Sequence, residues 1–531
     1  MIKMSNMAKK TRPLVLALCL MLCVFSSAQT VITIDDPATW TTAELSKYVG
    51  QTVVFSTPMV VCNNYYYTSS RLTISPQRIF APTNQALPLS DEYDYLRDHN
   101  SRSELTLSGV NGYHRMGETI VNLKAKVESS TQLKAVDEPL FVGNTRDDML
   151  AGIPSVDQKA KHNLLVCAFN LEYYLVENLG TGYGPDNSTE SDKQHTKIMQ
   201  ALSLIAADIF GFVEIEQGQQ ALRKLANALT QATGRTYSFI NDNGSSSGSY
   251  TKSGYVYCQE TVEPVNNLRK NDTQVSHRKM MQAFRHKQSG ESFIFSLNHF
   301  KAKSGTASGL NADQGDGQGT FNYTRTLEAQ SVLAQYNLNK TYYEDDDLLI
   351  MGDLNAYAKE DPIRTLTENG MTDLHRFFHA DSSYSYVYHD QAGYLDHALA
   401  NATLLPQITG MAAWHINSDE HDRFTYDKST DLSMFRCSDH DPVLVGLRLS
   451  TKTEQTAPHT NNFEVLINGN NPLIINAEGG HFVIYTIDGH LLLQGQITNN
   501  AYTPDINLTQ GLYIFAVYAD GKAQKHKLII P

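Results

Sequence analysis

The chain has 531 residues, 41% hydrophobic and 19% charged, which excludes a disordered, collagen-like or coiled-coil protein. A chain of this length predicts about three packed domains. Lysine and arginine total 43 against 56 aspartates and glutamates, so the formal charge is −13. This charge excludes a whole-protein positive field that attracts polyanions, and any nucleic-acid site must therefore be local.

Residues 1–28 have the pattern of a secretory signal peptide. Lys9, Lys10 and Arg12 precede the apolar run Leu14–Phe25, and Ser26–Ala28 supplies small residues before a cleavage site. The run is shorter than the ~20 apolar residues that cross a bilayer. We therefore predict export through the periplasm to the medium or the cell surface, with no stable membrane span.

Four cysteines follow the signal segment, at Cys62, Cys167, Cys258 and Cys437. Their wide spacing indicates neither a zinc site nor a dense disulfide framework. We expect at most one or two bridges.

Residues 29–145 read as an all-β domain. Short β-branched and apolar runs, with no long helical pattern between them, occur at Thr52–Ser56, Met59–Cys62, Leu105–Ser108 and Ile120–Val127. A small β-barrel or sandwich is predicted. Tyr65, Tyr66 and Tyr67 either stack on the bases of a single strand or pack as ordinary strand residues. The polar stretch Asn144–Lys161 is interpreted as a linker.

The middle of the chain, 160–450, changes to an α/β pattern. Apolar strands such as Leu164–Phe169, Phe293–Leu297 and Leu348–Met351 alternate with helical patterns such as Lys197–Ala207 and Gln219–Thr230. Each strand ends in polar residues, and α/β sheets place their chemistry at strand ends. The catalytic site is therefore expected in this domain.

Residues 463–531 form a third, all-β module after a polar stretch. The predicted strands are Phe482–Ile487, Leu491–Ile497, Gly511–Ala519 and His526–Ile530. Asp488-Gly489 and Asp520-Gly521 are two-residue turn signals typical of hairpins.

The middle domain contains no Ser-His-Asp elbow, phosphate-binding GxxxxGK[ST] loop or CxxC pair. Carboxylates, asparagines and histidines recur instead at separate strand ends. Oxygen ligands of this kind suit Mg²⁺, Mn²⁺ or Ca²⁺, and carboxamide and imidazole groups can contact phosphate oxygens.

Six motifs of this domain together resemble the endonuclease/exonuclease/phosphatase superfamily, and they follow its order. They are Asn170-Leu171-Glu172, Glu214 with Glu216, Asn298-His299-Phe300-Lys301, Gly352-Asp353-Leu354-Asn355, Leu395-Asp396-His397 and Ser438-Asp439-His440-Asp441. The resemblance covers 163–449 and implies the deoxyribonuclease-like fold, a layered β-sandwich with flanking helices. The runs at 299–303, 393–397 and 415–420 are similar to secreted bacterial nucleases.

The resemblance implies a role for each motif residue. Glu214 would be the principal ligand of a divalent metal, with Asn170 and Asp439 nearby; Mg²⁺ is favoured and Mn²⁺ or Ca²⁺ are alternatives. The catalytic roles would be orientation of His440 by Asp396, activation of water by Asp353, phosphate binding by Asn355 and hydrogen bonding to phosphate by His299. We expect no catalytic or direct metal-binding role for three neighbouring residues, Glu172, Glu216 and His397.

A local positive surface could come from cations beside the motifs. Arg278, Lys301, Lys303 and Arg325 would each bind backbone phosphate without reading sequence. The alternative is that they are solvated surface charges.

These inferences converge on a secreted, metal-dependent phosphodiesterase that cleaves DNA, and RNA as a further substrate, without sequence specificity. One alternative keeps the fold but takes a phospholipid or sugar phosphate; another is a catalytically inactive surface binding protein. The N-terminal domain resembles an OB-like module, and residues 463–531 resemble the sorting domain of type IX secretion. The latter implies the type IX machinery as a partner, and we expect a monomer.

Overall fold

The computed structural model describes residues 30–242, 250–270, 279–450 and most of 464–530, with gaps at 469–470, 476, 478, 488–489, 500, 505–507, 509 and 520–521. The predicted signal peptide lies outside the described residues. The chain divides into two compact units, Met1–Gln77 with Ser101–Gly143, and Arg78–Asn100 with Asn144–Pro531. Within the described ranges, every helix is too short or too polar to cross a membrane.

The smaller unit contains a nine-stranded sheet. Its spatial order is β1 (Thr30–Ile32), β2 (Thr52–Phe55), β7 (Lys124–Val127), β8 (Gln132–Ala135), β5 (Leu105–Ser108), β4 (Arg71–Ser75), β3 (Met59–Asn63), β6 (Thr119–Val121) and β9 (Leu140–Val142). The predicted strands are confirmed, with Ile120–Val127 split in two. Alternate residues such as Val53 and Phe55 are buried in one core. OB-like closure of this sheet stays a prediction.

The structure differs from the sequence interpretation in two segments. Helix α2 (Asp91–Ser103) lies within the stretch expected to be all β, and Arg78–Asn100 groups with the larger unit. The stretch 144–161 is not a free linker. It contains the capped helix α3 (Arg146–Leu150), and Val156 is buried in a core of the larger unit.

The larger unit is built on two six-stranded sheets. The first has the order β12 (Tyr237–Phe239), β13 (Thr251–Cys258), β11 (Ile209–Glu216), β10 (Leu164–Tyr174), β23 (Val443–Leu447) and β22 (Ile408–Ala413). The second has the order β14 (Val262–Lys270), β15 (Lys279–His286), β16 (Ser292–His299), β17 (Leu348–Asp353), β21 (Asp396–Asn401) and β18 (Met371–Asp373).

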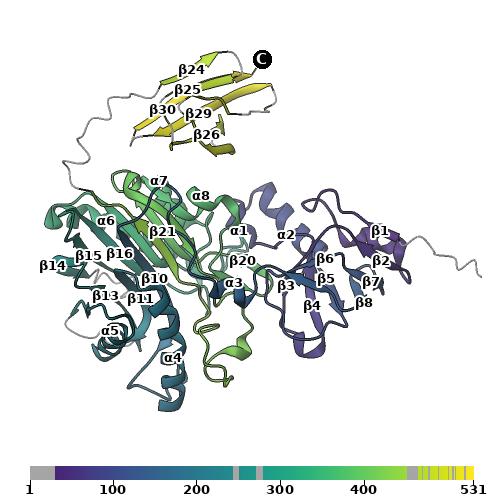
Figure 1. Cartoon of the computed structure of the whole chain (residues 1–531), viewed down its shortest axis with the longest axis horizontal. Helices are drawn as coiled ribbons and strands as arrows, with labels where there is room; N and C mark the ends of the chain where they lie inside the picture. Colours follow the sequence, from purple (N-terminus) through teal and green to yellow (C-terminus); the bar gives the residue numbers. More distant parts are fainter. Residues whose placement is uncertain are drawn as a thin grey trace, which may run out of the picture. The chain divides into compact units, whose positions relative to one another are not determined.

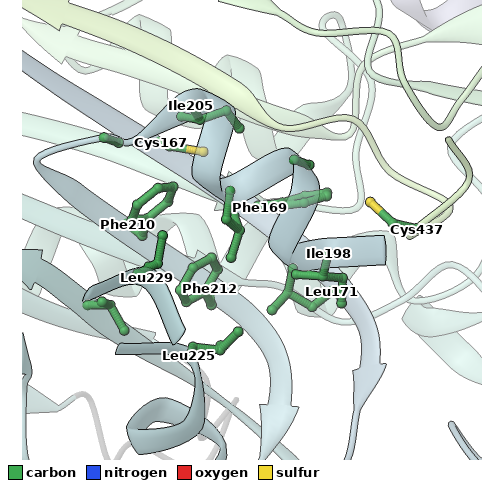
Figure 2. Close-up of a cluster of buried hydrophobic side chains, with 14 of the residues drawn as sticks. Cys167, Phe169, Leu171, Ile198, Ile205, Phe210, Phe212, Leu225, Leu229 and Cys437 are labelled. Carbon is green, nitrogen blue, oxygen red and sulfur yellow. The ribbon is translucent and has the colours of Figure 1, made fainter. Parts of the chain in front are cut away.

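Alternate residues along each strand face opposite sides of the sheet, so the apolar side chains form one core under the helices and another between the two sheets. In β10, Cys167 and Phe169 face helices α4 (Ser188–Ile205) and α5 (Gln220–Thr233), whereas Val166 and Ala168 face the second sheet. Figure 2 shows the helix-facing cluster, in which the side chains of the two helices pack on the phenylalanines of β10 and β11. The sandwich of sheets with flanking helices predicted from the sequence is therefore present (Figure 1).

Helices α6 (Asn322–Tyr343) and α7 (Asp361–Glu368) cover the outer face of the second sheet. The remaining short elements of the two units are α1 (Pro82–Gln85), α8 (Leu374–His379), β19 (Tyr386–Tyr388), β20 (Gln391–Gly393), η1 (Thr42–Tyr48), η2 (Tyr67–Ser69), η3 (Gly309–Asn311), η4 (Ala380–Ser382), η5 (Leu405–Gln407) and η6 (Asp422–Phe424). Strands β19 and β20 pair as an antiparallel hairpin.

The C-terminal residues form a three-stranded and a four-stranded sheet. The first has the order β24 (Glu464–Asn468), β25 (Asn471–Ile475) and β28 (Ala501–Tyr502); the second has β27 (Leu491–Gln496), β26 (His481–Thr486), β29 (Gly511–Ala519) and β30 (Lys522–Ile530). The β26–β27 and β29–β30 pairs are antiparallel, as the hairpin signals predict. The two predicted turn dipeptides themselves lie outside the described residues.

All four cysteines that follow the signal segment are free thiols and all are buried. Cys167 and Cys437 belong to the same apolar cluster (Figure 2). Burial raises the pKa of Cys437 to about 12, which keeps this thiol protonated and unreactive.

Candidate active site

Strand register brings three motif residues of the second sheet into one row. His299 ends β16 and pairs with Asp353, which ends β17; Asp353 in turn pairs with Asp396, which begins β21. The first sheet contributes Asn170 from β10, whose amide nitrogen lies 3.2 Å from Asp353 Oδ2. The polar ends of strands from both sheets therefore meet at one place, as predicted from their apolar runs.

His440 and Asp396 form a close pair. His440 Nδ1 lies 2.7 Å from Asp396 Oδ2, and the Ser385 hydroxyl donates to the same oxygen at 2.7 Å. Burial alone would lower the pKa of His440, but the carboxylates of Asp396, Asp439 and Asp353 raise it well above the ordinary value. The imidazole is therefore held protonated at neutral pH, with Nε2 turned away from Asp396.

Asp353 lies at the centre of the cluster. Its Oδ2 is 3.6 Å from His299 Nε2 and 3.9 Å from His440 Nε2, and its Oδ1 accepts the Asn355 backbone N–H at 2.8 Å. Burial raises the pKa of this carboxyl to about 7, and the negative charges of Asp396 and Glu214 act in the same direction. A carboxyl group with such a pKa can exchange a proton near neutrality.

Glu214, on β11 of the first sheet, lies beside His299. Its Oε1 is 3.6 Å from His299 Nε2, and its Oε2 accepts the Tyr173 backbone N–H at 3.1 Å. Glu214 has a φ of +59° at an irregularity of the β11–β13 pairing, which reorients its side chain relative to a regular strand.

Acidic side chains gather beside Glu214. Glu172 Oε2 is buried without a hydrogen-bond partner, and burial together with the Asp439 carboxylate raises the pKa of Glu172 to about 8. An oxygen-rich, repulsive cluster of this kind fits a hard divalent cation, which would relieve the repulsion. Asp353, Asp396 and His440 also bring ligand atoms within 4.8 Å of one another, but His440 and Asp396 already satisfy each other.

The four predicted phosphate-binding cations have different environments. Lys301 is exposed, and Arg278 lies outside the described residues. Lys303 Nζ is bonded at 2.6 Å to both carboxylate oxygens of Glu360, which is fully buried. Arg325 is also fully buried, and its guanidinium donates to the carbonyls of Lys301, Thr320 and Gln318. The expectation of phosphate contacts is therefore corrected for Lys303 and Arg325, whose charges are used inside the protein.

The three residues that were expected to have no direct role, Glu172, Glu216 and His397, lie in different environments. Glu216 is buried and accepts the backbone N–H groups of Val176, Glu177 and Asn178, so it holds a loop and is not a surface residue. His397 Nε2 donates a hydrogen bond to the Ala356 carbonyl oxygen at 2.7 Å. Glu172, by contrast, belongs to the site.

The loop that carries Asp439 and His440 is held by residues for which the sequence suggested no role. Asn417 Oδ1 accepts the Cys437 N–H at 2.9 Å, and its amide nitrogen donates to the His440 carbonyl at 2.6 Å. Asp441 Oδ1 accepts the backbone N–H groups of Asn417 and Ser418. In the sequence, the run at 415–420 stood out only by its similarity to secreted nucleases, and no catalytic or binding role was predicted for its residues.

The hairpin β19–β20 covers one side of the dyad and was also missed. The Tyr386 ring lies 4.7 Å from the His440 ring at an interplanar angle of 29°. Ser385, which precedes it, bonds Asp396. The segment is short and rich in tyrosine, a pattern that an ordinary edge strand shares.

Comparison with known proteins places residues 167–440 in a match to the Endonuclease/Exonuclease/phosphatase family model. No curated protein sequence matches the chain. Similar solved structures include the human Nocturnin catalytic domain with bound sulfate (15% identity, 53% of this chain, 93% of that chain, TM-score 0.35). A second is a Bacteroides thetaiotaomicron mannosyl-6-phosphatase (16% identity, 54% of this chain, 100% of that chain, TM-score 0.35). A third is D. rerio TDP2 with a single-strand DNA product (15% identity, 54% of this chain, 99% of that chain, TM-score 0.35). Likenesses of this size assign no substrate to the chain.

Proposed function

The chain belongs to the endonuclease/exonuclease/phosphatase family, and we propose that it is a secreted, metal-dependent phosphodiesterase that hydrolyses DNA, and RNA as a further substrate. The observation that carries this proposal is the unbroken series Glu214–His299–Asp353–His440. Successive side chains in the series are separated by 3.6, 3.6 and 3.9 Å. No covalent nucleophile is needed, because displacement at phosphorus depends chiefly on positioning and on neutralisation of charge.

The charge of each side chain indicates its role in the reaction. His440, held protonated by its carboxylate neighbours, would donate a hydrogen bond to a phosphate oxygen as negative charge develops. His299 would do the same from the Glu214 side. Asp353 would orient the attacking water and accept its proton, and Asn355 would position the phosphate.

A divalent cation, with Mg²⁺ favoured, would be held by Glu214 together with Asn170, Asp439 and Glu172. When bound, it would neutralise the carboxylates and the charge on the phosphate oxygens. Without such compensation, the negative cluster around Glu214 would repel a phosphodiester. This electrostatic requirement supports metal dependence independently of the family.

One assay panel tests the proposal. Plasmid, single-stranded DNA, RNA, sphingomyelin and sugar phosphates are incubated with Mg²⁺, Mn²⁺ or Ca²⁺, and each reaction is repeated with chelator. We expect metal-dependent cleavage of the nucleic acids by the wild type and by Glu368→Gln, which changes an exposed glutamate of α7. Hydrolysis confined to sphingomyelin or a sugar phosphate would favour those substrates instead, and hydrolysis of none would favour a binding protein.

Secretion is part of the same proposal. The segment 1–28 would direct export, and the C-terminal sheets would serve as a type IX sorting domain, because none of the site residues belongs to them. Mass spectrometry of protein from medium and cell surface should find an N-terminus near Gln29. Efficient export of a chain truncated after Ser450 would contradict the sorting role.

A further inference from the structure

We propose that two sets of tyrosine rings flank the reacting centre and bind unpaired bases on both sides of the scissile phosphate, so that single-stranded nucleic acid is the substrate class. This inference rests on the proposed phosphodiesterase function and extends it. The rings are Tyr173, Tyr183 and Tyr250, which begin at a residue bonded to Glu214, and Tyr386 and Tyr388, which begin at a residue stacked on His440.

The first set begins at the metal-binding side. Tyr173 donates its backbone N–H to Glu214, and its ring stacks on Tyr183 with centroids 5.1 Å apart and an interplanar angle of 23°. Tyr250 continues the row, 5.9 Å from Tyr183. The side chains of Tyr183 and Tyr250 are 52% and 47% exposed. A row of rings with two exposed members therefore begins at the residue whose backbone bonds Glu214.

The backbone beneath Tyr173 is unusual. Glu172 and Tyr173 have φ values of +48° and +52°, and the pairing of β10 with β11 is irregular between Asn170 and Tyr174. Two consecutive non-glycine residues in the left-handed region are costly. Such a bend re-aims side chains and is retained where their direction serves a function.

The second set begins at the dyad. Tyr386 stacks on His440, and Tyr388 lies two residues further along β19 on the same face, about 6.7 Å away along the strand. Tyr388 is 59% exposed. The hairpin is fixed in place, because Ala392 exchanges backbone hydrogen bonds of 2.8 Å with Ile79 and Ala81.

The charge distribution explains why rings would be needed. Of the three predicted phosphate-binding cations that the structure describes, only Lys301 is exposed, and the chain carries a formal charge of −13. Phosphate contacts alone therefore offer little attraction for a polyanion. Stacking on aromatic rings does not depend on charge and tolerates every base, but it requires a base released from its pair.

The test compares three substrates of equal length at fixed Mg²⁺: a single-stranded oligodeoxynucleotide, its duplex, and a strand made entirely of abasic residues. The full chain is assayed as wild type, Tyr183→Ala, Tyr388→Ala, the two Tyr→Phe counterparts, and Tyr323→Ala, a 44% exposed tyrosine on α6. Thermal melting verifies that each variant is folded.

The wild type should prefer the single strand to the duplex and to the abasic strand by about tenfold or more in kcat/KM. Each Tyr→Ala change should lower the value for the single strand about tenfold and leave the abasic strand within twofold. The Phe variants and Tyr323→Ala should behave as wild type. Equal losses on the base-containing and abasic strands, or no losses, would overturn the base platforms while leaving the phosphodiesterase intact. Cleavage of no strand, with hydrolysis of a sugar phosphate or phospholipid, would overturn the proposed function and the platforms together.

Discussion

His440 Nδ1 and Asp396 Oδ2 are 2.7 Å apart, and only 5% of the surface of His440 is exposed to solvent. The Ser385 hydroxyl donates to the same Asp396 oxygen at 2.7 Å, which holds the carboxylate against the imidazole. The pair is therefore a single functional unit.

Non-additive loss of activity is the first consequence of that unit. His440→Ala and Asp396→Asn should each lower kcat, and the double variant should be little worse than His440→Ala alone. Asp381→Asn, a change of an exposed aspartate, serves as the control. Losses that sum in log kcat would show that Asp396 acts independently of His440.

Asn417 should act on the rate through the position of the catalytic loop. Asn417→Ala removes the bonds to Cys437 and to the His440 carbonyl, and a displacement of about 1 Å can cost about a hundredfold in kcat. Asn417→Asp keeps the acceptor and loses the donor, so its loss should be intermediate. Steady-state kinetics should show the change in kcat with KM nearly constant, and an unchanged kcat would contradict the positioning role. Asn337→Ala on α6 is the control.

Substitution of Lys301 and of Lys303 should have different effects, although the two lysines are only two residues apart in the sequence. Lys301→Ala should weaken DNA binding and flatten its salt dependence without changing thermal stability. Lys303→Ala leaves the buried Glu360 carboxylate without its cationic partner, although the Thr83 hydroxyl stays bonded to it, so the free energy of unfolding should fall by about 3 kcal/mol. Replacing both Lys303 and Glu360 by Met should recover most of that loss. A stable Lys303→Ala protein with reduced DNA binding would restore the phosphate-contact interpretation.

Asp345 provides a pH-dependent stability test far from the site, at the opposite end of β17 from Asp353. Burial raises the pKa of its carboxyl from 3.8 to about 6, against the lowering effect of the Ser292 hydrogen bond. A raised acid pKa means that the folded state binds the proton more tightly, so stability is lost as pH rises from about 4 through 6. The full shift corresponds to about 3 kcal/mol, and residual solvent exposure should reduce this to about 1 kcal/mol.

Asp345→Asn should therefore be more stable than the wild type at pH 7 and not at pH 4. Urea midpoints across this range measure the difference, with Asp346→Asn, whose side chain is 73% exposed, as the control. A difference that does not change with pH would exclude ionisation of Asp345 as its cause.

The sequence predicted the site where chemistry follows an apolar strand directly. His299, Asp353 and Glu214 each follow or end such a run, and parallel pairing of β16 with β17 brings two of them together. It could not predict which charges are buried, because the partner of Lys303 is 57 residues away. Helix α2 was missed because its polar sequence gives almost no apolar period, with only Tyr93, Tyr95 and Leu96 as apolar residues. Ser385 and Asn417 act through tertiary contacts alone.

The most direct measurement of the central claim is cleavage of single-stranded DNA during metal removal and restoration, with wild type and Glu214→Gln compared. Wild-type activity should disappear in excess chelator and return with Mg²⁺, because the carboxylates around Glu214 need a cation before a phosphate can bind. Glu214→Gln should retain at most about 1% of the wild-type rate at low Mg²⁺, since one ligand charge is lost, and require more metal for half-maximal activity. Undiminished wild-type cleavage in excess chelator, or a Glu214→Gln protein with the metal dependence of the wild type, would contradict the account.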